Sequence, residues 1–280
     1  MKMLGKLLLR FYNRIMYYVQ EEIEMDKLSI EEHRRMLREH FGITTTPGQF
    51  TVALAGNPNV GKSTVFNALT GLHQHTGNWP GKTVDNAQGS FTYLDSSFLM
   101  VDLPGTYSIL AHTVEEQVAR DFICFGKPDA TLVVLDATCL ERNLNLALQV
   151  MEITPKVIVC VNLMDEAVKK NITINITALQ KELGVPVIPT AARNGIGLGD
   201  LRHALYEMSI GLALTNPRQI RYSSEVETAI QELAPKISRC IGHTLSPRWV
   251  ALRLLDGDQA FIDSITHYLD LENTLQELAV

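Results

Sequence analysis

The chain has 280 residues, of which 46% are hydrophobic and 20% charged, so a folded core is expected and disorder is not the default. Its 25 basic and 31 acidic side chains give a net charge of −6, which argues against binding nucleic acid by bulk phosphate neutralisation. No apolar run reaches the length of about 18 residues that indicates a transmembrane helix.

The first part of the chain, residues 1–48, is predicted to be a helical extension that ends in a linker near 43–49. Basic residues come first and acidic residues follow from Glu21. This helix could lie on an anionic membrane surface, but packing on the protein or on a partner is favoured. Its apolar residues recur at steps of three and four: Leu4, Leu8, Phe11, Ile15 and Val19.

Residues 49–213 have the pattern of an α/β domain. Short Val/Ile/Leu runs without polar alternation are separated by helix-length segments, which predicts a mainly parallel sheet with helices on both faces. The expected strands are Thr51–Ala55, Phe98–Val101, Thr131–Leu135, Val157–Val161 and Val185–Ile188. Residues 218–280 follow a breaker at Thr215–Pro217 and are expected to form a small all-helical domain, with turns at Ser246–Pro247 and Asp256–Gly257.

A phosphate-binding loop follows the first predicted strand. Its residues match G-x-x-x-x-G-K-[ST] and are Gly56, Asn57, Pro58, Asn59, Val60, Gly61, Lys62 and Ser63, with Thr64 opening the next helix. Backbone N–H groups of such a loop cradle phosphates, Lys62 reaches the outer phosphates, and Ser63 offers a hydroxyl to Mg²⁺.

A second motif, Asp102, Leu103, Pro104 and Gly105, follows the strand that ends at Val101. Asp102 is expected to hold Mg²⁺ through water, and the amide of Gly105 to face a γ-phosphate. A plain Asp-Pro-Gly turn is the alternative.

A third motif lies after the strand that ends at Val161 and consists of Asn162, Leu163, Met164 and Asp165. A carboxylate can accept both the N1–H and the exocyclic N2–H₂ of guanine, so Asp165 is the predicted specificity residue. The alternative is that Asp165 caps the following helix. One strand later, Thr190, Ala191 and Ala192 lie where a backbone N–H could meet the guanine O6.

In this order, the motifs resemble those of the Ras-like P-loop GTPases, and closer detail resembles the cytoplasmic part of the ferrous-iron transport protein B (FeoB) family. The segments that carry this likeness are Gly56–Asn59, Phe66–Gly71, Gly77–Val84, Asp102–Ser108, Asp136–Thr138 and Leu140–Leu144. The helical tail, over Leu245–Asp258, is similar to the family's helical spacer domain, which helps to retain GDP.

The resemblance implies a GTPase that hydrolyses GTP to GDP and phosphate and regulates ferrous iron transport. Thr83 would be the switch I threonine that closes on Mg²⁺, within a mobile segment 73–83 that adds Gly81 and Lys82 to the nucleotide site. Asn59 matches the asparagine that helps to hold K⁺ in potassium-stimulated members. The implied catalytic residues are Lys62, Asn59, Thr83 and Gly105.

Departures from commoner GTPases predict slow hydrolysis and modest nucleotide affinity. Thr106 follows Gly105 where many GTPases carry a glutamine. Near the base, Met164 replaces the lysine of the commoner N-K-x-D motif or the residue beside it, and Ala191 stands where a serine is usual. For Trp79, a partner contact and packing against the nucleotide site are both open.

A membrane permease, in the same longer chain or in a separate subunit, is the implied partner, which places the protein at the inner, cytoplasmic face of the cell membrane. No nucleic-acid partner is expected, and a homo-oligomer is open. The alternatives are a soluble GTPase of ribosome or RNA maturation, and a GTP-dependent binding module with very slow turnover. Four widely spaced cysteines indicate buried thiols in a reducing compartment: Cys124, Cys139, Cys160 and Cys240.

Overall fold

The computed structural model describes residues 30–71, 74–110, 113–241 and 245–278. The amphipathic pattern over 4–19 lies outside these residues. The chain divides into two compact units, one of which is Arg38–Gln219, while the other combines 220–278 with 30–37. Among the described residues, no helix is both long enough and apolar enough to cross a membrane.

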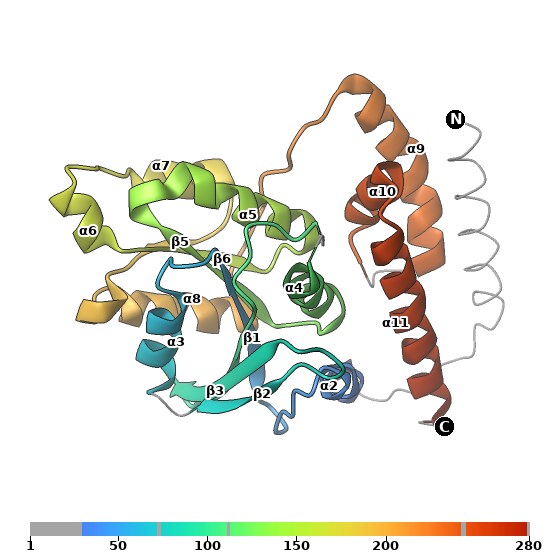
Figure 1. The fold of residues 1–280 in the computed structure, drawn as a ribbon, viewed down its shortest axis with the longest axis horizontal. Coiled ribbons are helices and arrows are strands. Elements are labelled where there is room, and N and C mark those ends of the chain that lie inside the picture. The colour runs from blue at the N-terminus through green and yellow to red at the C-terminus, as the bar shows by residue number, and fades with distance from the viewer. Residues whose placement is uncertain (1–29, 72–73, 111–112, 242–244, 279–280) are drawn as a thin grey trace. The chain divides into compact units, whose positions relative to one another are not determined.

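The larger unit is built on a seven-stranded sheet with the order β2-β3-β4-β1-β5-β6-β7 (Figure 1). Strands β4, β1, β5, β6 and β7 are parallel, and β2 and β3 join as antiparallel neighbours. The strands are β1 (Phe50–Gly56), β2 (Gln74–Asn78), β3 (Asp85–Tyr93), β4 (Ser96–Asp102), β5 (Ala130–Asp136), β6 (Val157–Asn162) and β7 (Val187–Pro189). The α-helices of the described residues are α2 (Ile30–His40), α3 (Lys62–Thr70), α4 (Val114–Phe125), α5 (Leu140–Ile153), α6 (Met164–Lys169), α7 (Ile176–Leu183), α8 (Leu198–Ser209), α9 (Ser224–Ile241), α10 (Pro247–Asp256) and α11 (Gln259–Leu278).

The prediction of a mainly parallel α/β sheet is confirmed, and each of the five predicted runs lies in or overlaps a strand. Two strands were not predicted, β2 and β3. Within the segment predicted to be mobile, 73–83, Gln74–Asn78 forms strand β2, which pairs with β3. The mobility of this segment stays a prediction. Both strands are rich in Gly, Asn, Gln and Ser, which weakens the sequence signal for a strand.

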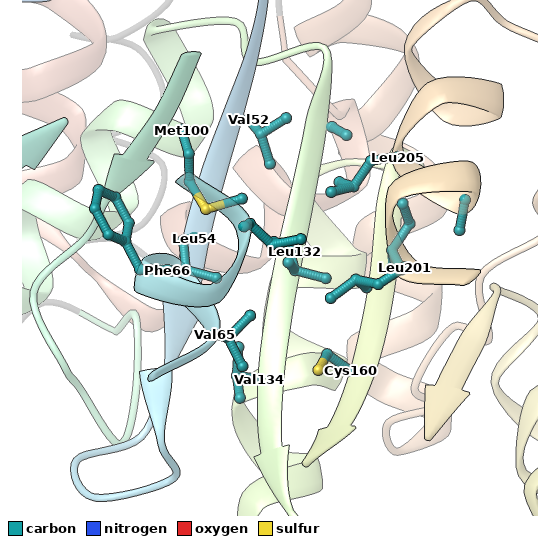
Figure 2. Close-up of a cluster of buried hydrophobic side chains, with 14 of the residues drawn as sticks. Val52, Leu54, Val65, Phe66, Met100, Leu132, Val134, Cys160, Leu201 and Leu205 are labelled. Atoms are coloured by element: carbon teal, nitrogen blue, oxygen red, sulfur yellow. The ribbon is translucent and has the colours of Figure 1, made fainter. Parts of the chain in front are cut away.

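Helices α3 and α8 contact each other and cover one face of the sheet, while α4 and α5 cover the other (Figure 1). Figure 2 shows the core on the α3 and α8 side, where Val52, Leu54 and Leu132 from the strands meet Val65 and Leu201 from the helices. Burial of one such side chain stabilises the fold by about 1.5–3 kcal/mol. Because both faces are covered, the whole of β6 is buried, which explains its unbroken apolar sequence.

The smaller unit contains α9, α10 and α11, and the two predicted turns separate these helices. Ser246 caps α10 by accepting the Trp249 amide at 3.3 Å, Pro247 opens the helix, and Gly257 ends it with φ 72°. Phe261 packs edge-on against Trp249, with ring centroids 6.0 Å apart. The turn predictions at Ser246–Pro247 and Asp256–Gly257 are therefore confirmed.

The segment expected to be a linker, 43–49, has no helix or strand, but part of it is buried. Ile43 is fully buried and Thr45 is 8% exposed. The cysteine prediction is right for Cys124 and Cys160, which are buried, and wrong for Cys139, which is exposed. Burial raises the pKa of Cys160 to about 12, so its thiol stays protonated.

Candidate functional site

The predicted motifs lie at one edge of the sheet, because each follows the carboxyl end of a parallel strand. The phosphate-binding loop follows β1, Asp102 ends β4, and Asn162 ends β6. Strand β1 lies between β4 and β5, with Leu54 in register with Asp102. Ligands of open α/β sheets bind at this edge.

The loop after β1 is shaped by close backbone approaches. A Cβ on Gly56 would lie 2.9 Å from the Val134 carbonyl oxygen, so the loop packs tightly on β5. Gly61 has φ +83°, and a Cβ there would lie 2.5 Å from Nδ2 of Asn162. Helix α3 then begins at Lys62 with no side-chain cap and no acidic residue in its first turn. Its first amides therefore remain available to an anion.

Lys62 reaches across this edge to β4. Its Nζ forms an ion pair with Oδ1 of Asp102 and donates to the Leu103 carbonyl oxygen at 2.6 Å. Burial raises the pKa of Asp102, and the charge and hydrogen bond of Lys62 oppose that shift. The predicted phosphate-binding lysine and the predicted Mg²⁺ residue are thus brought together.

The segment after Asp102 lies against the loop. A Cβ on Gly105 would lie 3.6 Å from Cα of Pro58, and the Thr106 amide donates to the Gly56 carbonyl oxygen at 3.3 Å. Thr106 is itself buried, at 5% exposure. The structure therefore uses this residue to hold the loop in place.

Asn162 links three parts of the edge. Its Nδ2 donates to the Val60 carbonyl oxygen at 3.1 Å, while its Oδ1 accepts from Thr190 Oγ1 and from the Ala192 amide, each at 3.1 Å. The side chain is 1% exposed. This role was not foreseen from the sequence, which offered only the spacing of Asn162 to Asp165.

Asp165 lies in the first turn of α6, where its Oδ2 accepts from Nδ2 of Asn194 at 3.2 Å. The alternative of a capping aspartate is wrong, because the N-cap is Leu163, with φ 61° and no side-chain cap. The amides expected near a base are engaged within the protein: that of Ala191 donates to Ile196 at 3.2 Å, and that of Ala192 to Asn162.

The predicted switch I residues Gly81, Lys82 and Thr83 form an exposed turn between β2 and β3. The hydrogen bonds of this turn run to its own ends, since the Lys82 amide donates to Trp79 at 3.0 Å and the Trp79 amide to Val84 at 2.9 Å. The Trp79 ring is buried against Phe41 and Phe122, so the reading of Trp79 as a partner contact is wrong. Packing of Trp79 against the nucleotide site stays a prediction.

The residues named for metal ions differ in setting. Ser63 and Asn59 are exposed, as is the predicted nucleotide-binding residue Thr64, and Asn59 has φ 67°. Asp102 is partly buried beside Lys62. Hydroxyl and carboxylate oxygens suit Mg²⁺, so the donor set of Ser63, Thr83 and Asp102 fits that ion chemically.

Asn57 carries a sign of an incomplete site. It is 2% exposed, and within the described part of the chain neither of its amide atoms has a hydrogen-bond partner. An unsatisfied buried group costs about 1–3 kcal/mol. Such groups occur where a ligand, an ion or water completes the bonding.

Comparisons with known proteins agree with this geometry. A family model described as ferrous iron transport protein B matches residues 50–205, and one described as FeoB cytosolic helical domain matches residues 222–279. The Fe(2+) transporter FeoB of Escherichia coli K12 is 38% identical over 229 residues, which are 79% of this chain and 29% of that protein. An Fe(2+) transport protein A/FeoB fusion protein of Porphyromonas gingivalis is 39% identical over 74% of this chain and 25% of its own length. The chain thus spans under a third of these relatives.

Among solved structures, the cytosolic domain of T. maritima FeoB in apo form aligns with a TM-score of 0.71 at 37% identity, covering 80% of this chain and 86% of that one. The GDP form I of the same domain aligns with a TM-score of 0.72 at 36% identity, covering 81% and 87%. The chain therefore belongs to the FeoB family of ferrous iron transport proteins, and it carries the family's G domain followed by its cytosolic helical domain.

Proposed function

We propose that this chain binds guanine nucleotides, hydrolyses GTP to GDP and phosphate, and acts as a switch that regulates ferrous iron transport through a membrane permease. The observation that supports this most directly is the junction of the loop after β1, the Asp102 segment and the Asn162 segment at one sheet edge. The G domain would be 49–213 and the helical spacer 218–280.

The phosphates would lie on the loop after β1. The amides of residues 59–63 and of the start of α3 supply donors, and Lys62 supplies the cation. To reach a phosphate, Lys62 must leave Asp102, which frees that carboxylate at the same moment. Nucleotide binding would therefore exchange this partly buried ion pair for a contact of Lys62 with phosphate and a contact of Asp102 with Mg²⁺.

The base would lie against Asp165. Its carboxylate offers two acceptor oxygens to the N1–H and N2–H₂ of guanine, and adenine cannot donate both. We call the segment after β7 that carries Ala192 the base loop. The hydrogen bonds from Asn162 to Val60 and Ala192 would hold the phosphate loop and the base loop at a fixed separation.

Metal ions would complete the charge balance. Ser63, Asp102 and Thr83 would hold Mg²⁺, and Asn59 would help to hold K⁺. When bound, these cations stabilise the negative charge that develops on the transferred phosphoryl group. Because Thr106 is buried, the attacking water would be oriented by the Gly105 amide and not by the side chain that follows it. We therefore expect slow hydrolysis.

Phosphate release from GTP tests the enzymatic part of the proposal. The full chain is assayed with and without Mg²⁺, in K⁺ and in Na⁺ at equal ionic strength, beside a Lys62→Ala variant. We expect turnover that requires Mg²⁺ and Lys62 and rises in K⁺. Equal phosphate release by the Lys62→Ala variant would refute the proposed site. Tight GTP binding without phosphate release would instead favour the module with very slow turnover.

The permease would lie in the same longer chain or in a separate subunit, with this part at the cytoplasmic face of the membrane. An antibody against the G domain tests the first arrangement in cells of the source organism. A membrane-bound band far larger than 31.2 kDa indicates a single chain, and a band at 31.2 kDa indicates a separate subunit. In either case, loss of Fe²⁺ uptake in a strain that carries Lys62→Ala tests the regulatory role.

A further inference from the structure

Trp79, four residues before Thr83, is held in a buried aromatic cluster of Phe41, Trp79 and Phe122. Its ring centroid lies 6.3 Å from that of Phe41 and 5.4 Å from that of Phe122, and Phe41 and Phe122 are themselves 5.4 Å apart. All three contacts are edge-to-face, and Trp79 is only 2% exposed. Such pairs add about 0.5–1.5 kcal/mol each beyond their buried area.

Phe41 belongs to residues 38–45, which we name the N-terminal clasp. The clasp is fastened to the G domain at its start, where Arg38 donates to the Lys127 carbonyl oxygen at 2.7 Å and to Oδ2 of Asp129 at 3.0 Å. Asp129 in turn accepts from the Thr51 amide at 2.9 Å, which joins the clasp to the central strand. Ile43 is fully buried. The clasp is therefore a packed part of this unit.

The clasp also contacts the turn that follows Trp79 and strand β3 beyond that turn. A Cβ on Gly42, which has φ +71°, would lie 3.2 Å from Cγ of Pro80. The Gly42 carbonyl oxygen accepts from Nε2 of Gln88 on β3 at 3.1 Å. The backbone of the clasp at Gly42 thus meets the Pro80 ring and the Gln88 side chain at close range.

Anchoring Trp79 fixes the turn that carries Thr83. The Trp79 amide donates to the Val84 carbonyl oxygen and the Lys82 amide donates to the Trp79 carbonyl oxygen, so the turn closes on Trp79 at both ends. Thr83 itself is exposed. A threonine on a short turn with one buried end has fewer positions to explore before it reaches a ligand.

We propose that the N-terminal clasp is a positioning element for the switch threonine: Phe41 holds Trp79, and Trp79 sets the place from which Thr83 closes on the nucleotide and its metal ion. The inference rests on the proposed GTPase function. The family model matches from residue 50, so the clasp precedes the matched region while Trp79 lies inside it. The contacts described above for the phosphate loop, Asp102 and Asp165 run to residues other than Phe41 and Trp79.

The test uses the full chain with Trp249→Phe. The chain has two tryptophans, so this change leaves Trp79 as the one fluorescent reporter. Phe41→Ala removes the aromatic contact, and Phe41→Leu keeps most of the apolar volume if the alanine variant folds poorly. Leu201→Ala is the control for general loss of packing, because Leu201 is a core residue of α8 and lies in a different hydrophobic cluster. Acrylamide quenching of Trp79, GDP affinity and kcat for GTP are measured for each.

We expect Phe41→Ala to raise the quenching of Trp79 severalfold and to lower kcat by about tenfold, with GDP affinity unchanged. For Phe41→Leu, the quenching and kcat should lie between those of Phe41→Ala and those of the parent. Leu201→Ala should change neither the quenching of Trp79 nor kcat. An unchanged kcat in a Phe41→Ala variant that folds, or an equal loss in Leu201→Ala, overturns the positioning role. A parent chain without any GTP turnover refutes the proposed function, and the positioning role falls with it.

Discussion

Asn162→Ala is the substitution whose effect can be worked out most fully, because the side chain makes three buried hydrogen bonds. At about 1 kcal/mol net for each bond, their loss costs about 3 kcal/mol. The loss at Thr190 is the smallest, since its hydroxyl also lies 3.1 Å from Sγ of Cys160. The Val60 carbonyl oxygen and the Ala192 amide lose their bonds to this side chain. We therefore expect a loss of about 2–4 kcal/mol in the free energy of unfolding of the G domain.

The same change should weaken nucleotide binding. Without the tie, the phosphate loop and the base loop must be ordered when the ligand binds, and an ordering cost of about 1.4 kcal/mol lowers affinity tenfold. The affinities for GDP and GTP should fall by the same factor, because both nucleotides use the phosphate loop and the base loop.

Urea unfolding followed by Trp79 fluorescence, again with Trp249→Phe, reports on the G domain, and titration with a fluorescent GDP analogue reports the affinity. Asn143→Ala is the matched control: Asn143 is 2% exposed and its Oδ1 accepts from the Asp136 amide at 2.9 Å, but it does not join the two loops. It should destabilise the fold without loss of GDP affinity. A cost below about 1 kcal/mol for Asn162→Ala, or an equal affinity loss in Asn143→Ala, would refute the reasoning.

Three further changes give distinct readings. Asp165→Asn removes a charged acceptor worth about 1.5–3 kcal/mol per bond, so the affinity for GDP should fall at least tenfold. Xanthosine diphosphate carries a carbonyl in place of the guanine amino group and should bind the variant better than it binds the parent. If calorimetry shows the same preference for GDP over xanthosine diphosphate in both proteins, Asp165 is not the specificity residue. Gly61→Ala should lower the thermal unfolding temperature more than Gly195→Ala does. Both glycines have positive φ, but only a Cβ at Gly61 would meet a side chain, at 2.5 Å. Equal losses of stability would mean that backbone strain alone accounts for both effects. Hydrogen bonds from Arg248 lower the pKa of Glu227 from 4.5 to about 2, so the stabilisation that Glu227→Gln removes is full above pH 4.5 and is lost as the pH falls through about 2. Unfolding of the two proteins between pH 2 and pH 6 should converge at the acid end, and a constant difference would contradict an ionic origin.

The parts of the site that could be predicted were those written in short stretches of sequence. The phosphate loop has a fixed spacing and a strand before it, and the continuous apolar run Val157–Val161 can hardly be anything but a strand covered on both faces. Turn chemistry at Ser246–Pro247 was equally local. Each of these signals depends on neighbours within a few residues.

The parts that could not be predicted depend on contacts between distant residues. Arg38 and Asp129 are 91 positions apart, and nothing in either local sequence marks them as a pair. Asn162 was correctly placed at a strand end, but its direction is set by Val60 and Ala192, which only the folded sheet brings near. Strand β3 is polar along most of its length and owes its place to pairing with β4.

The strand order has a consequence for how this protein is made. Strand β1 has neighbours only at β4 and β5, so on a ribosome it has no complete place in a sheet until the chain beyond residue 136 has emerged. The N-terminal clasp also cannot complete its packing before then, because its contact residues Phe122 and Asp129 lie in the same later part of the sequence. The first third of the polypeptide is thus synthesised well before the partners that hold it, and an apolar segment such as Val52–Ala55 stays exposed during that interval. Slow synthesis between residues 50 and 130 should therefore increase capture by chaperones or aggregation, and it should not lead to earlier folding.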